Sequence, residues 1–419
     1  MPKTVLINHV YSYLNRGDSA IVESMAHFLE EKYGPLRIVM LSRFYETNRD
    51  YYEQFGWKSA PPLWTTPVRK NKVLLLREAL TRLGRIVVAY ATGSTVSLTD
   101  EQREAVELYK EADLILDAGG GSLYSSNKYP IYLDLYQHLF NLYAAKKLGK
   151  PVVIAPQSIG PLPRWHDRQV TMSLLRDVDH VLVREQVSER LLQAHDVKCT
   201  LTPDIAFLGN YVGTPSVRAR AMAESFGQAR QNVGVTVLNW SWSADSRADS
   251  EAAIQHYLMK IASAVETLPD DTNVWVFPQV TAGHGDSDLP VSKRLEDLGS
   301  KRVRVLDARL PASDLTWLYG QMDAFVGSRM HSCIFAITQG VPTIGLAYQP
   351  KTLGTYSLLG LSKLAVDIET FSEHWLADQL KDILSRPTHW TRRFQGAARI
   401  AKRDVETSYR RATSPFLLT

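Results

Sequence analysis

The stretch DAFVGSRMHSCIFAITQGVPTIGLAYQPK (residues 323–351) predicts a strand, a turn, a helix and a second strand in succession. Residues 323–326 form a short apolar run that ends at Gly327. Residues 330–339 carry apolar side chains at helical spacing, and residues 343–347 are a second apolar run. Strands joined by a helix in this way build an open α/β sheet, which holds its ligands at the carboxyl ends of the strands.

Polar and charged side chains follow the first of these strands. Ser328 and Arg329 fall on the turn, and His331 and Ser332 fall on the first helical turn. Free backbone N–H groups and the helix dipole favour an anion at that place, so these residues predict a phosphate or carboxylate pocket. Lys351 follows the second strand and is expected to approach the same pocket. A cap or a solvated side chain is the alternative explanation for a single histidine there.

Composition places the chain among ordinary globular proteins. It has 419 residues, of which 45% are hydrophobic and 22% are charged, a length sufficient for two domains. The formal net charge of +4 is too small to indicate a nucleic-acid partner, for which clustered basic residues are expected.

Two features predict the compartment. Cys199 and Cys333 are the only cysteines, so the sequence predicts no disulfide framework, no thiolate metal site and a reducing environment. The first residues, MPKTVLIN, read as a strand and not as a secretion signal. We therefore expect a cytoplasmic protein.

The first half of the chain repeats the alternation of strand and helix. Residues 4–8 are a strand, and Asn15, Gly17 and Asp18 form a polar loop before an amphipathic helix. An ordinary helix entry capped by Asp18 is the alternative interpretation of that loop.

Three later strands in this half end in glycine or polar residues. Three consecutive glycines allow a ligand or another backbone to come very close, because no Cβ is in the way. The residues at these strand ends are Gly119, Gly120, Gly121, Gln157, Ser158 and Arg184.

A polar stretch at residues 214–231 separates this series from a second one. We predict an N-terminal Rossmann-like domain over residues 1–212 on the acceptor side and a C-terminal one over residues 213–375 on the donor side. Residues 376–419 are predicted to be helices that pack back on the first domain. The fold class is therefore α/β, with two Rossmann-like domains facing across a cleft.

Two further segments allow more than one interpretation. Residues 44–64 are aromatic and predict an irregular loop, which either presents rings to a sugar or is anchored on the core by them. Residues 70–90 are basic and amphipathic, and contain too many charges to span a membrane. We expect a helix packed on the sheet, with peripheral contact to an anionic membrane surface as the alternative.

A glycine-containing loop carries His284, Asp286 and Asp288. Their spacing matches no fixed set of metal ligands, so we predict a solvated loop and no metal site.

Seven segments resemble the polysaccharide pyruvyl transferases, in that family's order and over nearly the whole chain. The matching segments are NRGDSAI (15–21), GGGSLY (119–124), QSIGPL (157–162), VREQVS (183–188), PDIAF (203–207), GSRMHS (327–332) and YQPK (348–351). The run of three glycines departs slightly from the pair found in many relatives. The tryptophans at positions 240 and 242 match no motif of the family.

The resemblance implies a GT-B-type glycosyltransferase fold and transfer of pyruvate from phosphoenolpyruvate to a saccharide as a cyclic ketal. It implies a role in the biosynthesis of exopolysaccharide or cell-wall polysaccharide, with an acceptor that is free or lipid-linked. Arg184, His331 and Lys351 fall on the family's donor-site residues. The chemistry requires no metal and no cofactor beyond the donor itself, since cations bind the carboxylate and phosphate and histidine can move protons.

Two other functions remain open. A nucleotide-sugar glycosyltransferase or epimerase also joins two Rossmann-like halves, but the sequence shows no carboxylate or aromatic clamp for a ribose and base. A carbohydrate-binding protein without activity would need aromatic rings and not the three donor-site residues together.

Overall fold

The computed structural model describes residues 2–65, 72–127, 132–228, 230–239, 247–281, 287–299, 302–307 and 309–418. The chain divides into two units. Unit 1 comprises Met1–Tyr13, Ile21–Thr202 and Glu406–Thr419, and unit 2 comprises Leu14–Ala20 and Pro203–Val405. Two helices, α1 (Arg16–Tyr33) and α15 (Pro387–Leu417), have residues in both units. The domain boundaries after residues 212 and 375 stay predictions.

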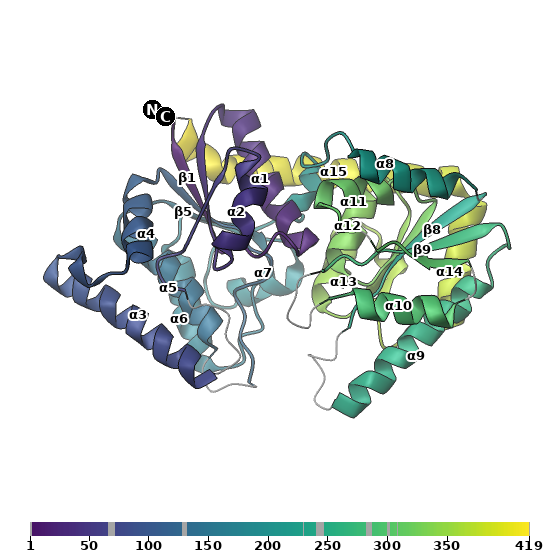
Figure 1. Ribbon diagram of the computed structural model, residues 1–419, viewed down its shortest axis with the longest axis horizontal. Helices are drawn as coiled ribbons and strands as arrows, with labels where there is room; N and C mark the ends of the chain where they lie inside the picture. Colours follow the sequence, from purple (N-terminus) through teal and green to yellow (C-terminus); the bar gives the residue numbers. More distant parts are fainter. Residues whose placement is uncertain are drawn as a thin grey trace. The chain divides into compact units, whose positions relative to one another are not determined.

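Within the described residues, unit 1 contains a parallel sheet of seven strands in the order β3-β2-β1-β4-β5-β6-β7. Figure 1 labels β1 and β5 of this sheet. The strands are β1 (Thr4–Asn8), β2 (Arg37–Leu41), β3 (Lys58–Ala60), β4 (Leu114–Asp117), β5 (Val152–Gln157), β6 (His180–Val183) and β7 (Thr200–Leu201). All residues of β1 are buried, and its nearly continuous apolar sequence is typical of a parallel strand covered on both faces.

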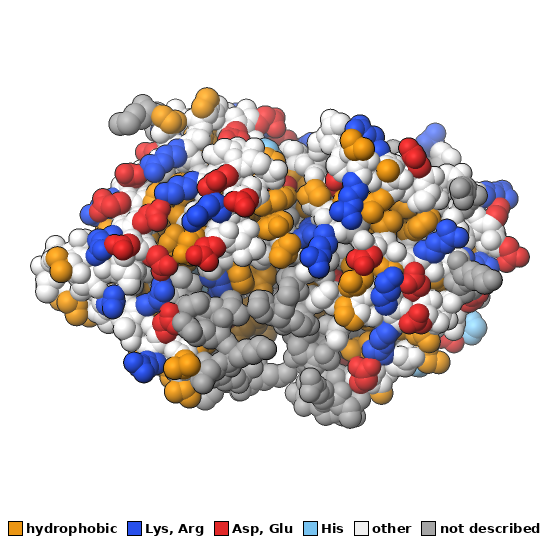
Figure 2. Space-filling view, viewed as in Figure 1, with side chains coloured by type: hydrophobic (Ala, Val, Ile, Leu, Met, Phe, Trp, Pro, Cys, Tyr) orange, Lys and Arg blue, Asp and Glu red, His pale blue; other side chains and the backbone are white. Residues whose placement is uncertain are grey.

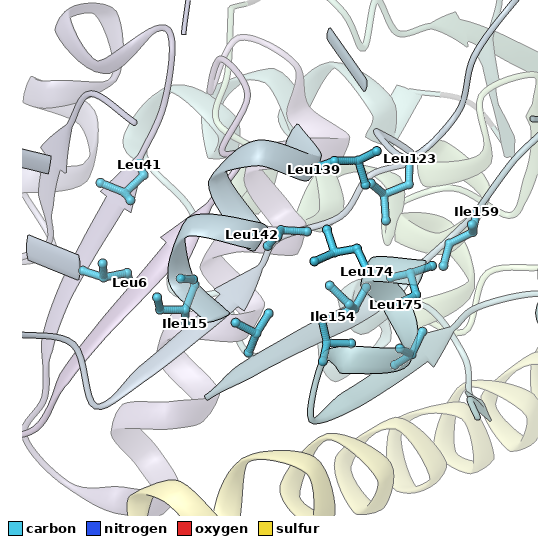
Figure 3. Packing of buried hydrophobic residues seen from close by; sticks show 14 of the residues in the cluster. Leu6, Leu41, Ile115, Leu123, Leu139, Leu142, Ile154, Ile159, Leu174 and Leu175 are labelled. Carbon is cyan, nitrogen blue, oxygen red and sulfur yellow. The ribbon is translucent and has the colours of Figure 1, made fainter. Parts of the chain in front are cut away.

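The core of unit 1 lies between this sheet and helices that pack on it. The helices of the unit include α2 (Tyr45–Glu53), α3 (Lys72–Thr92), α4 (Asp100–Glu111), α5 (Leu133–Lys147), α6 (Trp165–Asp177) and α7 (Gln186–Gln193). Figure 3 shows part of the core, where Leu139 and Leu142 of α5 and Leu174 of α6 pack with Ile115 and Ile154 of the strands.

Unit 2 repeats the same order of strands. Its described residues form a parallel sheet of six strands in the order β10-β9-β8-β11-β12-β13. The strands are β8 (Gln231–Thr236), β9 (Thr272–Val276), β10 (Val303–Val305), β11 (Ala324–Gly327), β12 (Thr343–Ala347) and β13 (Ala365–Asp367). The helices are α8 (Val217–Glu224), α9 (Arg247–Glu266), α10 (Leu289–Leu298), α11 (Ala312–Tyr319), α12 (Met330–Thr338), α13 (Pro350–Leu358) and α14 (Glu373–Ser385). The predicted pair of Rossmann-like domains is confirmed.

The aromatic segment 44–64 is more regular than predicted. It forms α2 and β3, so the prediction of an irregular loop is wrong. The alternative in which the rings anchor the segment is confirmed, because Tyr52 and Trp57 are fully buried. Phe55 stacks on Trp57 with 4.8 Å between the ring centroids. Aromatic packing of this kind stabilises a short helix whose own sequence favours it only weakly.

Helix α3 is more exposed to solvent than predicted. Residues 72–92 form the predicted helix α3, but among its described side chains only Ala79 is buried, so the expected packing on the sheet is wrong for most of its length. None of the helices in the described parts of the chain has the length and apolar character needed to cross a bilayer.

Helix α15 has buried side chains in each unit. Phe394 and Ala401 are fully buried in unit 2, and Tyr409 is fully buried in unit 1. Tyr409 lies 5.2 Å from the ring of Phe28, and Thr413 Oγ1 lies 2.8 Å from the hydroxyl of Tyr33. The last turns of α15 are therefore part of the core of unit 1.

Candidate functional site

The residues predicted to bind an anion, 328–332, follow the carboxyl end of β11 in unit 2. A Cβ at Gly327 would lie 2.4 Å from Cys333 Sγ and 2.9 Å from Ser332 Oγ. Only glycine therefore allows the first turn of α12 to pack this closely on the end of the strand. Burial raises the pKa of the Cys333 thiol to about 12, so this thiol is protonated at neutral pH and is a packed group.

His331 lies in the first turn of α12, where two remote segments meet its ring. Its Nε2 lies 3.6 Å from Oδ2 of the buried Asp204, which is longer than a hydrogen bond. That Nε2 is buried and has no hydrogen-bond partner among the described residues. A Cβ on Gly17 would lie 2.3 Å from His331 Nδ1, so the start of α1 packs directly on the imidazole. Residues 15–18, Asp204 and His331 therefore converge in unit 2.

The segment of residues 15–18 is held in place at the start of α1. Asn15 Oδ1 accepts a hydrogen bond of 3.2 Å from the backbone N–H of Gly17. Arg16 is buried and donates from Nε to the backbone oxygen of Leu310. Asp18 is half-buried in the first turn of the helix. Gly17 is thus held against the imidazole by the hydrogen bonds of Asn15 and Arg16.

The hydroxyl groups of Ser328 and Ser332 are buried and have protein partners. Ser328 Oγ lies 2.5 Å from the hydroxyl of Tyr257, and Ser332 Oγ lies 2.6 Å from Thr236 Oγ1. Burial raises the pKa of Tyr257, so its hydroxyl stays protonated at neutral pH. These contacts hold α12 to the neighbouring elements of unit 2. Substrate binding by the two serines stays a prediction.

Arg329 forms a two-pronged ion pair with Asp288. Arg329 Nε lies 2.8 Å from Asp288 Oδ2, and Arg329 Nη2 lies 2.6 Å from Asp288 Oδ1. The two side chains are 13% and 1% exposed. Asp288 Oδ2 also accepts a hydrogen bond of 2.9 Å from the backbone N–H of Val280. The guanidinium is therefore fixed within unit 2, and its role in substrate binding stays a prediction.

Some sequence candidates fall outside the described residues. These are His284 and Asp286 of the glycine loop and the tryptophans at positions 240 and 242. The third member of the loop, Asp288, is the partner of Arg329. In the part of the chain that the structure describes, no group of three or more histidine, cysteine or acidic side chains is arranged to hold a metal ion.

Lys351 lies in the first turn of α13, directly after β12. β12 pairs in parallel with β11, and Gly345 lies beside Gly327 in this pairing. Lys351 and His331 therefore follow the carboxyl ends of adjacent strands. The half-buried Lys351 holds its Nζ 5.7 Å from the ring centroid of Tyr348, a cation–π distance.

Arg184 lies in unit 1, directly after β6, and is buried. Its Nε donates a hydrogen bond of 3.1 Å to Ser158 Oγ, and its Nη2 donates one of 3.4 Å to the backbone oxygen of Gly120. Three of the predicted strand-end segments, which follow β4, β5 and β6, thus meet at one guanidinium.

The backbone of the loop after β4 requires glycine at three consecutive positions. Residues 119, 120 and 121 have φ values of 79°, 98° and 95°, in the region that other residues rarely adopt. A Cβ on Gly119 would also lie 2.8 Å from the Cβ of Gln157. The run therefore brings the backbone of this loop against the end of β5.

The sequence reasoning missed an imidazole and carboxylate pair in unit 1. His9 follows β1 with a φ of 62°, and its Nδ1 is hydrogen-bonded to Asp117 at the end of β4. The other oxygen of Asp117 accepts a hydrogen bond of 2.6 Å from Gln157 Nε2. The ring of His138 packs edge-on against His9 at 3.8 Å. Burial, followed by the charges of His9 and Arg43, holds the pKa of His138 well below its usual range.

Sequence signals exist for part of what was missed. His9 and Asp117 each lie at the end of an apolar run, which is where ligand-binding residues are expected. Asp204 precedes the short helix Ile205–Leu208 and caps it by accepting a hydrogen bond from the N–H of Ala206. Nothing in the sequence predicts the pairing of Asp288 with Arg329.

Comparisons with known proteins agree on one family and one fold. A family model described as polysaccharide pyruvyl transferase matches residues 15–350. The amylovoran biosynthesis protein AmsJ of Erwinia amylovora is 23% identical over 392 residues, which cover 88% of this chain and 89% of that protein.

Solved structures show the same fold at low identity. A putative UDP-N-acetylglucosamine 2-epimerase from Listeria monocytogenes has a TM-score of 0.60 and 13% identity, covering 100% of this chain and 98% of its own. The UDP-GlcNAc 2-epimerase of Methanocaldococcus jannaschii has a TM-score of 0.57 and 12% identity, covering 98% of this chain and 100% of its own. The expected GT-B type of fold is thereby confirmed.

Proposed function

The chain belongs to the polysaccharide pyruvyl transferase family, and we propose that it transfers pyruvate from phosphoenolpyruvate to a sugar of a polysaccharide or of its precursor. The product is a cyclic pyruvate ketal, and phosphate is released. The observation that carries this proposal is the convergence of residues 15–18, Asp204 and His331 in unit 2, since three segments of the family's pattern meet there at one imidazole.

The reaction requires a proton to be added to the donor and protons to be removed from two sugar hydroxyls. The vinyl carbon of phosphoenolpyruvate takes up a proton, and one sugar hydroxyl attacks the carbon next to it and loses its own proton. The C–O bond to phosphate then breaks, a second hydroxyl closes the ring, and its proton leaves with the phosphate. The two protons lost by the sugar hydroxyls are thus balanced by one proton gained by the new methyl group and one gained by the phosphate.

His331, Arg184 and Lys351 suit different parts of this reaction. We assign proton transfer to His331, because an imidazole gives and accepts protons near neutral pH. Arg184 and Lys351 are assigned to the carboxylate and phosphate of the donor, since guanidinium and ammonium groups form strong hydrogen bonds with such anions. The backbone N–H groups at the start of α12 favour the departing phosphate.

The test is to incubate the full chain with phosphoenolpyruvate and candidate oligosaccharides. Phosphate release and an NMR signal from a ketal methyl group are the expected results. Nucleotide sugars are tested in parallel, because that reaction is the alternative for a protein of this fold. Release of nucleotide, with no phosphate released from phosphoenolpyruvate by any acceptor, would overturn the proposal.

Donor affinity should depend on Arg184 and Lys351. Replacing either by alanine is expected to weaken phosphoenolpyruvate binding about 10- to 100-fold, because one charge-assisted contact is lost. Arg184→Lys should restore only part of the affinity if two parallel N–H groups bind the carboxylate. The exposed Lys363 provides a control, since Lys363→Ala should bind the donor normally. Loss of thermal stability with unchanged donor affinity would contradict the binding role.

The contact of Gly17 with the imidazole predicts a second effect. A methyl group at this position would lie 2.3 Å from His331 Nδ1, so Gly17→Ala should displace the ring and lower kcat by about tenfold or more. Steady-state kinetics and the melting temperature of the variant check this.

Gly396→Ala is the matched control for that experiment. Gly396 lies within α15, and a Cβ there would have no neighbour within 4 Å. This variant should keep its kcat and gain stability of up to about 1 kcal/mol from the better helix propensity of alanine. Equal kcat values for the two variants would show that the ring does not need its place against Gly17.

A further inference from the structure

Helix α3 of unit 1 is attached to the rest of the unit along the side that contains Ala79 and Arg82. Trp64 Nε1 donates a hydrogen bond of 3.0 Å to the backbone oxygen of Ala79, the buried residue of the helix. Arg82 forms a 2.9 Å ion pair with Glu101, and its backbone oxygen accepts a 3.0 Å hydrogen bond from Gln102 Nε2. This side of α3 therefore faces α4 and the end of β3.

The neighbouring side of α3 exposes large apolar side chains. Leu76, Leu80 and Val87 are 44%, 58% and 56% exposed, and Tyr90 is 84% exposed. Their spacing of four, seven and three residues places them on one face of the helix. Soluble proteins rarely leave such a face in water, and a contiguous exposed apolar face indicates an interaction surface. Figure 1 shows α3 at the edge of unit 1, where Figure 2 shows apolar side chains among basic and acidic ones.

The charges of α3 are mostly positive. Arg77 and Arg85 are exposed, and Arg77 lies next to Leu80 around the helix. The only acidic residue between positions 72 and 92 is Glu78, which lies 3.5 Å from Arg82 and on the same side of the helix as Arg85. An exposed apolar stripe on a helix with a net positive charge is typical of a helix that lies in the interface of an anionic bilayer.

We propose that α3 docks this protein on an anionic lipid surface, with Leu76, Leu80, Val87 and Tyr90 entering the acyl boundary. Arg77 and Arg85 contact the anionic headgroups. A second copy of the chain is a poorer occupant, because each α3 carries three arginines and a single glutamate, Glu78, which is already paired with Arg82. The inference does not depend on the donor or on the reaction, because it concerns only the surface of unit 1.

The test is co-sedimentation of the full chain, without substrates, with vesicles of phosphatidylglycerol and phosphatidylcholine. We expect binding at low salt, release at high salt, and little binding to vesicles of phosphatidylcholine alone. Replacing both Arg77 and Arg85 by serine should weaken binding about 30-fold, and replacing both Leu80 and Val87 by serine should weaken it about tenfold or more.

Matched controls distinguish binding through this face of α3 from nonspecific adsorption to vesicles. Val187 has the same 56% exposure as Val87 but lies on α7, so Val187→Ser should bind vesicles normally. Replacing Arg392 and Arg399 on α15 by serine removes the same charge and should also leave binding unchanged. The proposal is overturned by failure to sediment at low salt, by equal losses in variants and controls, or by self-association that depends on Leu80 in the absence of vesicle binding.

Discussion

Replacement of His331 by alanine is expected to lower kcat about 10²- to 10⁴-fold and to change the affinity for phosphoenolpyruvate only a few-fold. The imidazole is assigned to proton transfer, so its contribution is made mainly in the transition state and not in the bound donor complex. Steady-state kinetics combined with a thermal-shift titration of phosphoenolpyruvate measure the two quantities on the same protein.

A second variant, at Asp204, tests the carboxylate beside this imidazole. Asp204→Asn keeps an acceptor for the N–H of Ala206 but removes the negative charge 3.6 Å from His331 Nε2. A smaller loss of kcat than that of His331→Ala is expected for it, because the imidazole is kept and only the neighbouring negative charge is lost. His374→Ala, at a strongly exposed position on α14, is the control. A folded His331→Ala protein with nearly normal kcat would show that His331 does not perform the proton transfer.

Replacement of Asp288 by alanine is expected to lower the free energy of unfolding by about 3 to 5 kcal/mol. Its carboxylate is 1% exposed, and its removal leaves the Arg329 guanidinium and the N–H of Val280 without their acceptor. Urea unfolding followed by circular dichroism measures the loss, and the melting temperature should fall with it.

The pair of Arg302 and Asp270 in the same unit is the matched control. It joins the same two residue types at 2.9 Å, but Asp270 is fully exposed. Asp270→Ala should therefore leave the melting temperature nearly unchanged, since an exposed ion pair adds little to stability. If Asp288→Ala behaved like Asp270→Ala, the buried pair would not be holding Arg329 in place.

The fold was predictable because each strand of these sheets is short and apolar, and glycine or polar residues follow it. The strand ending at Gly327 and the helix containing His331 lie where their sequence patterns place them. Alternating strands and helices also fix the direction of every strand, and so the edge at which the polar residues gather.

The remaining details depend on contacts between distant segments. Gly17 and Asp204 meet His331 only because of the tertiary fold, and local sequence carries no information about that distance. Ser328 and Ser332 carry hydroxyls suited to a substrate, yet both are buried against other side chains. The predicted packing of α3 on the sheet was wrong for a related reason. An amphipathic pattern shows that a helix has an apolar face but does not show what that face contacts.

The course of α15 has a consequence for synthesis of the chain. Residues 406–419 belong to unit 1, and Tyr409 packs on Phe28 there, yet the whole of unit 2 is translated before them. Unit 1 therefore leaves the ribosome with the surface around Phe28 uncovered, and it closes only after unit 2 has emerged. Domains usually fold in the order in which they are made, whereas here the first unit should be the last to be completed. Nascent chains stalled before residue 406 should accordingly be sensitive to protease in unit 1.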